Sequence, residues 1–581
     1  MKKSVLFILA AALLCLASCT PENEVNPDLQ GEADVMFVGN IITMDQESPR
    51  AKAMTVKSGK VQYVGTLDEA RKYCGDKTDV REYPKAYIYP GFLEGHLHGM
   101  EVASRFDQVN LAAIDDDLET TMDDFVALMA QDVKGHPDRK IYKGAGWSVK
   151  FDVLPTAAML DPICPDVPMV LSSVDGHSMW INTCAIKKYG VDKKENIEKY
   201  GTDCIHIDGN GFPTGYISEN AMELVRPALL LSKEELKTAL LKWQDIAFSY
   251  GITGVVEAAI TTDGVEKDAW MELAKSGLWK LRTYAMECVQ DPMPDEKFWG
   301  DLNKVLEHHK QYQNEYFQVY GVKIFVDGVV EAHTAWLLEP YNDDPTYYGK
   351  KSFPDPNRIA EAVEFANKNG MNVHFHTIGD GAIRTAVEGI IKGQQAAGVT
   401  DARNTMAHLQ IIKPEDIKKM ADNNIIPVCA PLWCPIDPEY NKHEIAYLGK
   451  ERVDSEYRVR SFFDAGCKVN FHSDYPVSPS ISMPLTIYAA VKRTIPFYGE
   501  AGIQNPTEAV TVQQALEAMT VNVAWQLKEE NRLGQLKSGM IANLSICDVD
   551  FLNAPIENVA DAKVVATYVD GVKVFESKEE Q

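Results

Sequence analysis

The stretch PGFLEGHLH (residues 90–98) carries two histidines one residue apart and follows the apolar, β-prone run AYIY (residues 86–89). Side chains on a strand alternate between its two faces, so His96 and His98 point the same way and can hold one ion. A His-x-His pair at a strand end is typical of the first half of a metal site. Such pairs also occur among ordinary surface and core histidines, so the rest of the chain has to support this hypothesis.

Length and charge narrow the possible functions. The chain has 581 residues, of which 45% are hydrophobic and 24% are charged, and its formal charge is −26. This length suits several domains or a barrel enzyme with insertions. So acidic a protein is a poor candidate for binding DNA, RNA or anionic lipid through its surface field. We therefore expect no nucleic-acid partner and a solvated acidic surface.

The first residues predict export. A basic start is followed by the apolar run Val5 to Leu16 and then by LASC (residues 16–19). The run is too short to span a membrane comfortably and is typical of a signal peptide, residues 1–18. The small residues before Cys19 resemble the lipobox of bacterial lipoproteins, which implies lipid attachment to the Cys19 sulfur. An ordinary signal peptide with an incidental cysteine is the alternative.

The polar, proline-containing residues 19–31 suit a flexible tether between that lipid and a folded domain. The prediction is thus an exported bacterial lipoprotein of the cell envelope whose only contact with the membrane is its lipid anchor. Thr20, in place of Asp after Cys19, favours the outer membrane. The sequence leaves open which face of the envelope holds the lipid and whether copies of the chain form a homo-oligomer.

Both ends of the mature chain predict β-strands. Short apolar runs punctuated by Gly, Asn and Asp fill residues 33–65 and indicate antiparallel strands. Similar runs lie between Asn543 and Phe575, where Asp570-Gly571 marks a hairpin turn. Neither end has enough strands to bury a core alone. We therefore expect one small β-sandwich built from residues 32–89 and 536–578.

The middle of the chain alternates between two patterns. Short apolar β runs, such as residues 322–326 and 373–376, are separated by helical patterns, such as residues 357–368 and 414–423. This alternation argues for a parallel α/β architecture, and the length of residues 90–535 suits an eight-stranded TIM barrel with insertions. No glycine-rich phosphate loop of Walker or Rossmann type is present.

Nine cysteines follow Cys15 and Cys19, and none forms a C-x-x-C pair. Their odd number and irregular spacing argue against a disulfide framework. Disulfides between Cys184 and Cys204 and between Cys429 and Cys434 remain possible.

In such a barrel the chemistry lies at the C-terminal ends of the strands. Polar residues end five of the predicted strand segments, namely His96 and His98, Lys323, His376, His408 and Asp474. A lysine in an apolar strand is costly to bury unless it is paired or chemically altered. Each residue also has an ordinary explanation, because Asp474 could cap a helix and His374 or His472 could be hydrogen-bonded core histidines. Five segments ending in metal-ligand chemistry argue against coincidence.

The chain resembles the amidohydrolase superfamily, in particular the branch that includes N-substituted formamide deformylases, over about residues 33–575. The resemblance rests on PGFLEGHLH (90–98), GAGW (144–147), DGHSMWINTCAI (175–186), DGNGFPTGYISENA (208–221), GITGVVEA (251–258), VKIFVDG (322–328), HFHTIGDGA (374–382), HSDYPV (472–477) and GQLKSGMIANL (534–544). It implies an α/β fold with a (β/α)8 TIM barrel, an inserted segment around residues 110–230 and a β-sandwich from both termini.

The resemblance also implies a ligand set for two divalent metal ions. His96, His98 and Asp474 would bind the more buried ion, and His376 and His408 would bind the second. Zinc is the expected occupant because the ligands are imidazoles and oxygens, while manganese, iron and cobalt stay open.

Lys323 resembles the lysine that this family N-carboxylates, which turns a cation into a bridging carbamate. Two such ions acidify a bridging water and polarise the substrate carbonyl. Asp474 would take the proton of the water and pass it to the leaving amine. The expected function is hydrolysis of a C–N bond in an amide, formamide or related small-molecule substrate.

Other functions remain open on the same site. They are hydrolysis of a cyclic amide or imide, deamination and isomerisation. A tethered binding protein that has lost turnover is the alternative from another class, because fold does not determine function.

The chain departs from the family pattern at three positions near the site. Glu94 and Glu257 stand where the family has Asp, and Ala407 stands where it commonly has Glu. None of these changes removes a predicted ligand, but Ala407 removes a side chain expected to support the ligands. We therefore expect a specificity different from that of characterised relatives. The predicted substrate-binding residues are Asp175, His177 and Trp147.

Overall fold

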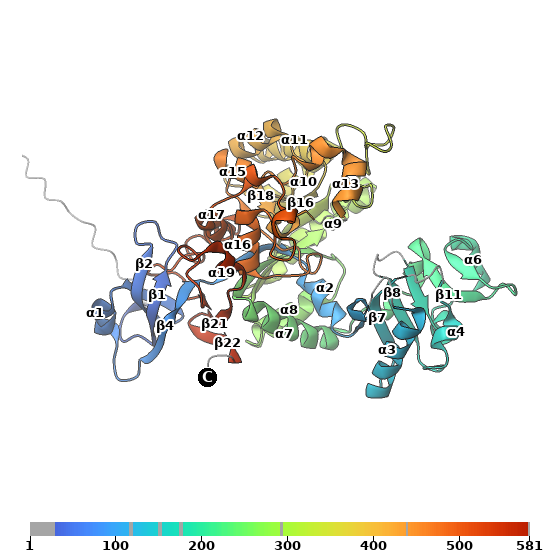
Figure 1. Ribbon diagram of the computed structural model, residues 1–581, viewed down its shortest axis with the longest axis horizontal. Helices are drawn as coiled ribbons and strands as arrows, with labels where there is room; N and C mark the ends of the chain where they lie inside the picture. Colours follow the sequence, from blue (N-terminus) through green and yellow to red (C-terminus); the bar gives the residue numbers. More distant parts are fainter. Residues whose placement is uncertain are drawn as a thin grey trace, which may run out of the picture.

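The structure is a computed structural model that describes residues 29–114, 120–148, 154–173, 178–290, 294–436 and 440–578 (Figure 1). The predicted signal peptide and Cys19 lie outside these residues. Within the described ranges, no helix is both long and apolar enough to cross a bilayer. The end of the predicted tether is fixed to the folded chain, because Gln62 Nε2 donates to Leu29 O at 2.7 Å and to Gly31 O at 2.9 Å.

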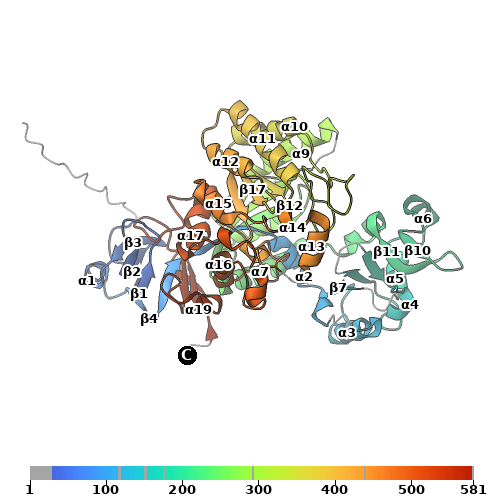
Figure 2. The same cartoon turned by 45° about the horizontal axis from the view of Figure 1, so that its top comes forward.

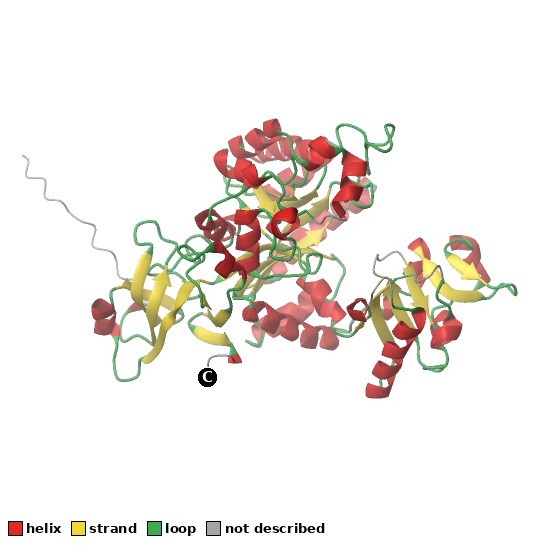
Figure 3. Ribbon diagram, in the orientation of Figure 1, coloured by secondary structure: helices red, strands yellow, loops and turns green. Residues whose placement is uncertain are grey.

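Eight parallel strands form a nearly closed barrel at the centre of the molecule (Figures 1 and 3). In spatial order they are β5 (Phe92–Leu97), β12 (Ile252–Ile260), β13 (Arg282–Cys288), β15 (Phe317–Phe325), β16 (Asn372–Thr377), β17 (Thr405–His408), β18 (Ile426–Cys429) and β19 (Asn470–Phe471). The last strand returns to the first, where Asp474 N donates to His96 O at 3.1 Å. The predicted TIM barrel is confirmed.

Helices connect successive strands and cover the outside of the barrel. They include α7 (Lys233–Ser249), α8 (Glu266–Lys275), α9 (Asp295–Gln311), α10 (Pro356–Lys368), α11 (Asp380–Ala397), α12 (Pro414–Asp422), α15 (Val459–Asp464), α16 (Met483–Lys492) and α17 (Val512–Ala518). α7 illustrates why these segments are helical. Ser232 and Glu235 form a capping box at its start, and Leu236, Leu240 and Trp243 recur at helical spacing on its buried face.

Strands from both ends of the chain form a single seven-stranded sheet. They are β1 (Val35–Ile42), β2 (Arg50–Lys57), β3 (Lys60–Gly65), β4 (Asp79–Pro90), β20 (Leu544–Cys547), β21 (Val564–Val569) and β22 (Val572–Glu576), in the order β22-β21-β20-β4-β1-β2-β3. Lys60 in β3 also bridges to Ile541, so the sheet folds back over an apolar core that both ends supply. The predicted hairpin turn is present, with φ of 51° at Asp570 and 73° at Gly571. The two termini therefore build one sheet together, and β4 passes directly into barrel strand β5.

The inserted segment lies between α2 (Gly99–Arg105) and α7 and forms a lobe beside the barrel (Figure 2). Its six-stranded sheet runs β10-β11-β9-β8-β7-β6, with β6 (Val109–Asn110), β7 (Tyr142–Trp147), β8 (Met169–Ser173), β9 (Ser178–Ile181), β10 (Ile205–Ile207) and β11 (Pro213–Ser218). Its helices are α3 (Met122–Gly135), α4 (Ala157–Leu160), α5 (Thr183–Lys188) and α6 (Lys194–Tyr200). The apolar cores of this lobe draw only on residues 109–229, so it packs around its own interior.

The remaining elements are short. They are α1 (Leu67–Ala70), β14 (Gln313–Asn314), α13 (Tyr440–Leu448), α14 (Lys450–Val453), α18 (Val521–Gln526), α19 (Ile556–Ala560) and the 3-10 helices η2 (Arg71–Tyr73), η3 (Ala112–Ile114), η4 (Glu219–Leu224), η5 (Arg226–Ala228), η6 (Pro431–Trp433), η7 (Gly499–Gly502) and η8 (Pro506–Glu508). All nine cysteines in the described part of the chain are free, so neither of the two pairs left open by the sequence is a disulfide.

Candidate metal centre

The barrel brings the six predicted ligand residues to the C-terminal ends of its strands. Their positions are His96 and His98 at the end of β5, Lys323 in β15, His376 in β16, His408 at the end of β17 and Asp474 just after β19. Imidazole rings from three strands approach one another. The ring centroids of His96 and His408 are 5.0 Å apart, and those of His376 and His408 are 4.6 Å apart. All of these side chains are buried except that of His98, which is 18% exposed.

Asp474 connects the two histidines of the His-x-His pair. Its Oδ1 lies 2.9 Å from His96 Nε2 and 3.1 Å from His98 Nε2. Burial acts to raise the pKa of the Asp474 carboxyl, but His98, His408 and His472 act in the opposite direction and its pKa is lowered overall. The carboxylate is therefore held in its ionised, ligand-competent form.

Lys323 presents the buried amine that the sequence predicted. Its side chain is fully buried, and its Nζ has no hydrogen-bond partner among the described residues. Burial lowers the pKa of Lys323 to about 8, although the nearby Asp474 acts to raise it. Burial lowers the pKa of His96 and of His376, and the charge of Lys323 lowers both further.

Several of the buried nitrogens have no hydrogen-bond partner within the part of the chain that the structure describes, although one of them, His96 Nε2, lies 2.9 Å from Asp474 Oδ1. They are His96 Nε2, His408 Nδ1 and both ring nitrogens of His472. Buried polar atoms are normally hydrogen-bonded, so four such nitrogens around one carboxylate require an explanation. Burial lowers the pKa of His376 and of His472 to about 4, so these imidazoles are neutral and can offer a lone pair. The group fits a bound cation.

Comparison with known proteins identifies the family. A family model described as the amidohydrolase family matches residues 86–575. The chain belongs to the amidohydrolase family. The resemblance inferred from its motifs is therefore confirmed.

Relatives of this amidohydrolase extend over its whole length. It is 27% identical over 572 residues to Protein LONG AFTER FAR-RED 3 of Arabidopsis thaliana, a match covering 96% of this chain and 94% of that protein. It is 24% identical over 558 residues to the N-substituted formamide deformylase of Arthrobacter pascens, covering 94% and 98%. Its fold is shared with an uncharacterized metal-dependent hydrolase from Pyrococcus furiosus, with a TM-score of 0.72 at 22% identity, covering 89% of this chain and 100% of that one.

Two histidines that the sequence favoured as core residues lie inside this centre of the amidohydrolase. His472, His96 and Asp474 place one ligand atom each within 4.8 Å of one another. His374 Nε2 lies 2.6 Å from His96 Nδ1, and His374 Nδ1 lies 2.6 Å from Thr405 Oγ1. This chain of hydrogen bonds orients the His96 ring. His374 stands two residues before His376 on β16 and so shares its strand face, whereas His472 and Asp474 follow the end of β19.

Buried carboxyl groups of the amidohydrolase support the ligand-bearing loops. Glu94 Oε1 accepts from Ser473 N at 2.9 Å and from His96 N at 3.3 Å, which ties β5 to the turn that carries Asp474. Burial raises the pKa of Glu94 to about 8. The longer Glu in place of the usual Asp therefore serves as a link between two predicted ligands.

Asp327 plays a similar part on the other side of the barrel. It accepts from the backbone N–H groups of Trp336, Ile378 and Gly379 at 2.8–3.1 Å. Burial raises the pKa of Asp327 to about 7, and these hydrogen bonds act against that rise. This carboxyl holds the loop after β15 against the end of β16, next to His376.

Trp147 lies inside the lobe of the amidohydrolase. It lies on β7 in the lobe, is fully buried and donates from Nε1 to Leu171 O at 2.9 Å. The ring packs in the core of the lobe, and the contact of Trp147 with substrate stays a prediction. Asp175 and His177, the other two predicted substrate contacts, lie outside the described residues.

Replacing Trp147 tests this prediction. Trp147→Ala should destabilise the lobe by about 3–5 kcal/mol, the usual cost of removing a buried tryptophan. Hydrogen exchange at the amides of β7 and β8 should report the loss, because exchange measures local opening. The milder Trp147→Phe variant should leave KM unchanged. A several-fold rise in its KM with unchanged hydrogen exchange would support a contact between Trp147 and the substrate.

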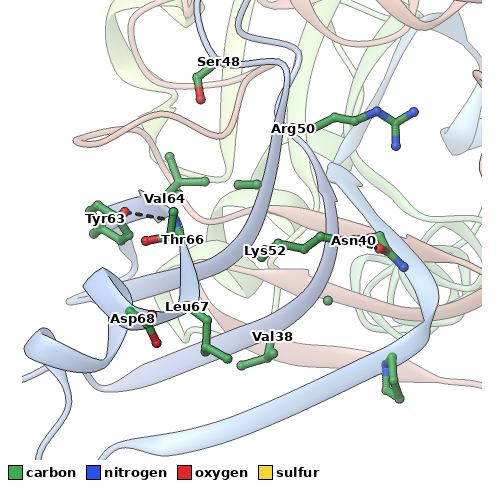
Figure 4. A pocket seen from close by; sticks show the side chains of 14 residues that line it. Val38, Asn40, Ser48, Arg50, Lys52, Tyr63, Val64, Thr66, Leu67 and Asp68 are labelled. Carbon is green, nitrogen blue, oxygen red and sulfur yellow. Dashed lines mark hydrogen bonds between the residues drawn. The ribbon is translucent and has the colours of Figure 1, made fainter.

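The positions of two cavities can be compared with that of the candidate metal centre. A cleft of about 840 Å³ opens on the terminal sheet among β1, β2 and β3, but it contains none of the candidate site residues (Figure 4). Its cations are paired, since Lys52 donates to Asn40 Oδ1 at 2.8 Å and Arg50 bonds Asp550 at 3.0 Å. A cavity of about 380 Å³ is lined by Cys288, the last residue of β13 and the register partner of Lys323. This second cavity opens at the same end of the amidohydrolase barrel as the candidate metal centre.

Proposed function

We propose that this amidohydrolase is a metal-dependent enzyme that hydrolyses the C–N bond of a small amide or formamide. The observation that carries the proposal is the group of unpartnered, neutral histidine nitrogens gathered around the ionised Asp474 and the buried Lys323. The relationship to an N-substituted formamide deformylase over almost the whole chain supports the choice of bond.

The residues present can hold two divalent ions, and zinc suits the imidazole and oxygen ligands. His96, His98 and Asp474 would hold the first, and His376 and His408 the second. His472 is a further candidate for the first ion, because its ring nitrogens lie close to His96 and Asp474. A divalent cation supplies Lewis acidity, which makes a water molecule more acidic and a carbonyl carbon more electrophilic.

Lys323 would join the two sites as an N-carboxylated side chain. The neutral amine adds to CO2, forming an N–C bond and releasing a proton, so that a buried cation becomes a carbamate anion with two oxygen ligands. Full burial and the absence of a hydrogen-bond partner at Nζ among the described residues favour the neutral amine that this reaction needs.

Asp474 would move the proton in catalysis. Its carboxylate is ionised and lies within hydrogen-bond distance of His98, the most exposed of the six predicted ligand residues. It can accept a proton from the attacking water on a carboxylate oxygen and donate it to the nitrogen of the leaving amine. Such a transfer leaves the carboxylate in its starting form.

Removal of metal tests this proposal. Dialysis against 1,10-phenanthroline should abolish the release of amine from N-substituted formamides, and addition of Zn²⁺ should restore it, because water and carbonyl lose their activation without the ion. The assay should follow free amine over a panel of N-acyl amines, cyclic amides and aminopurines. Unchanged turnover in the metal-free protein would refute metal dependence, and turnover of aminopurines alone would refute amide hydrolysis.

A further inference from the structure

Trp433 lies directly against one of the predicted ligands. It ends the short helix η6, which follows β18, and its ring is stacked on the His408 imidazole with centroids 5.0 Å apart and planes 7° apart. The same ring meets the edge of His472 at 6.0 Å. An aromatic ring parallel to an imidazole restricts rotation of that imidazole about its Cβ–Cγ bond.

The indole itself is anchored. Trp433 Nε1 donates to Ser478 Oγ at 2.8 Å, and Ser478 is buried. Ser478 belongs to the turn that begins at Asp474, where Val477 N donates to Asp474 O at 2.8 Å. Trp433 therefore connects a histidine on β17 with the turn that carries the predicted proton-transfer residue.

Besides Trp433, the His408 ring contacts only other histidine rings among the aromatic contacts of the described residues. Its Nδ1 has no hydrogen-bond partner among the described residues, and the preceding position is Ala407, which offers no polar side-chain atom. His408 has φ of 75° at the end of its strand, a conformation that non-glycine residues rarely adopt. Histidine ligands usually depend on a neighbouring group to hold the ring in place.

We propose that Trp433, anchored by Ser478, is a positioning residue that orients the His408 imidazole toward a metal ion. This inference rests on the proposed function. At His96, the side chain of His374 orients the ring through a 2.6 Å hydrogen bond. At His408, the stacked Trp433 ring would have the same role.

Metal binding is the appropriate measurement, because it does not require the substrate. Metal-free protein should be titrated with Co²⁺ alone, with the dissociation constants and the d–d absorption spectrum as readouts. Trp433→Ala should weaken the weaker Co²⁺ site about 10- to 100-fold and change its spectrum, as loss of a ligand's supporting group does. Ser478→Ala, which keeps the stacked ring, should weaken that site roughly 2- to 10-fold, the effect of one hydrogen bond.

A double variant tests the anchor. Trp433→Phe keeps a ring over His408 but has no N–H, so Trp433→Phe with Ser478→Ala should bind Co²⁺ as Trp433→Phe alone does. Trp299→Phe is the matched control, because Trp299 is also partly buried but lies on α9 outside the barrel. It should leave the affinity and the spectrum unchanged.

The outcomes separate this inference from the proposed function. Wild-type Co²⁺ affinity and spectrum in Trp433→Ala would overturn the inference, and a further loss on adding Ser478→Ala to Trp433→Phe would overturn the anchor. If circular dichroism shows that Trp433→Ala does not fold, Trp433→Leu, which removes the ring but keeps an apolar side chain, takes its place, and unchanged Co²⁺ binding by that variant would overturn the inference. Failure of the wild-type protein to bind Co²⁺ would refute the proposed function, and with it this inference.

Discussion

Replacing Asp474 by Asn should reduce kcat by about 10³-fold while the protein keeps its fold and at least one metal ion. The change removes the negative charge that lies between His96 and His98 but keeps the size of the side chain and one oxygen. Positioned proton transfer typically contributes about 10²- to 10⁴-fold to a rate. Turnover of an N-substituted formamide, measured at saturating Zn²⁺, and metal analysis of the same sample check the two halves of this expectation.

Asp416→Asn is the matched control for this variant. Asp416 is also a fully buried aspartate, but it lies on α12 and is paired with Arg384 at 2.8 Å and Lys419 at 3.2 Å. Its replacement should affect stability and leave kcat unchanged. Full activity of Asp474→Asn would show that another group moves the proton, whereas loss of all bound metal would show that Asp474 acts only as a ligand.

Strand alternation is the reason why much of this centre could be predicted from sequence. In a parallel barrel, polar residues at the ends of successive strands meet at one rim, so His96, His376, His408 and Asp474 could be grouped from the strand pattern alone. The hairpin turn at Asp570 followed equally directly from local chemistry, since an Asp-Gly pair suits the positive φ values of that turn.

The contributions of His374 and His472 could not be predicted because they depend on which neighbouring strand faces them. Local pattern shows that His374 shares a strand face with His376, but it does not show that the His96 ring lies 2.6 Å away. Strand register is also irregular beside the candidate metal centre. The pairing of β13 with β15 shifts between Ala285 and Met286, which changes the neighbours of every later residue, including Lys323.

Trp147 and Trp433 show a second limit of prediction from sequence. The motif around Trp147 belongs to the family pattern, yet the ring faces the interior of a lobe that packs around its own core. Trp433 carries no motif, yet it stacks on a predicted ligand and bonds a residue 45 positions away. Long-range packing of this kind follows from how loops after different strands meet, and local sequence does not encode it.

Lys323→Met should have opposite effects on function and on the stability of the metal-free protein. Methionine fills the same buried space without an amine, so the proposed carbamate could not form and the second metal ion would lose the bridging ligand proposed for it. We expect kcat to fall roughly 10³-fold, because Lewis-acid activation contributes several kcal/mol to such reactions. Metal analysis should show fewer ions per chain than in the wild type, and the ¹³C NMR signal of a carbamate formed from labelled bicarbonate should be absent.

In the presence of a chelator, the same variant should be more stable than the wild type by about 1–3 kcal/mol, as judged by urea unfolding. The reason is that the Lys323 amine is buried without a hydrogen-bond partner among the described residues, and such burial costs free energy. Lys267 is the matched control, because it is also buried but donates to Thr261 O at 2.7 Å and lies 3.3 Å from Glu287. Lys267→Met should destabilise the protein by about 3–5 kcal/mol, since it leaves Glu287 buried without its lysine partner.

The sign of the Lys323→Met effect decides between two accounts of that residue. If Lys323 is a structural lysine that forms a stabilising interaction, it should behave like Lys267. Its replacement should then destabilise the metal-free protein. A lysine kept for its chemistry destabilises the fold until CO2 and metal convert it into a ligand, so removing it stabilises the metal-free protein and abolishes turnover. If Lys323→Met destabilises the metal-free protein and keeps its metal and its turnover, a chemical role of Lys323 is excluded. In that case the lysine would stabilise the fold and would not be needed for metal binding or catalysis.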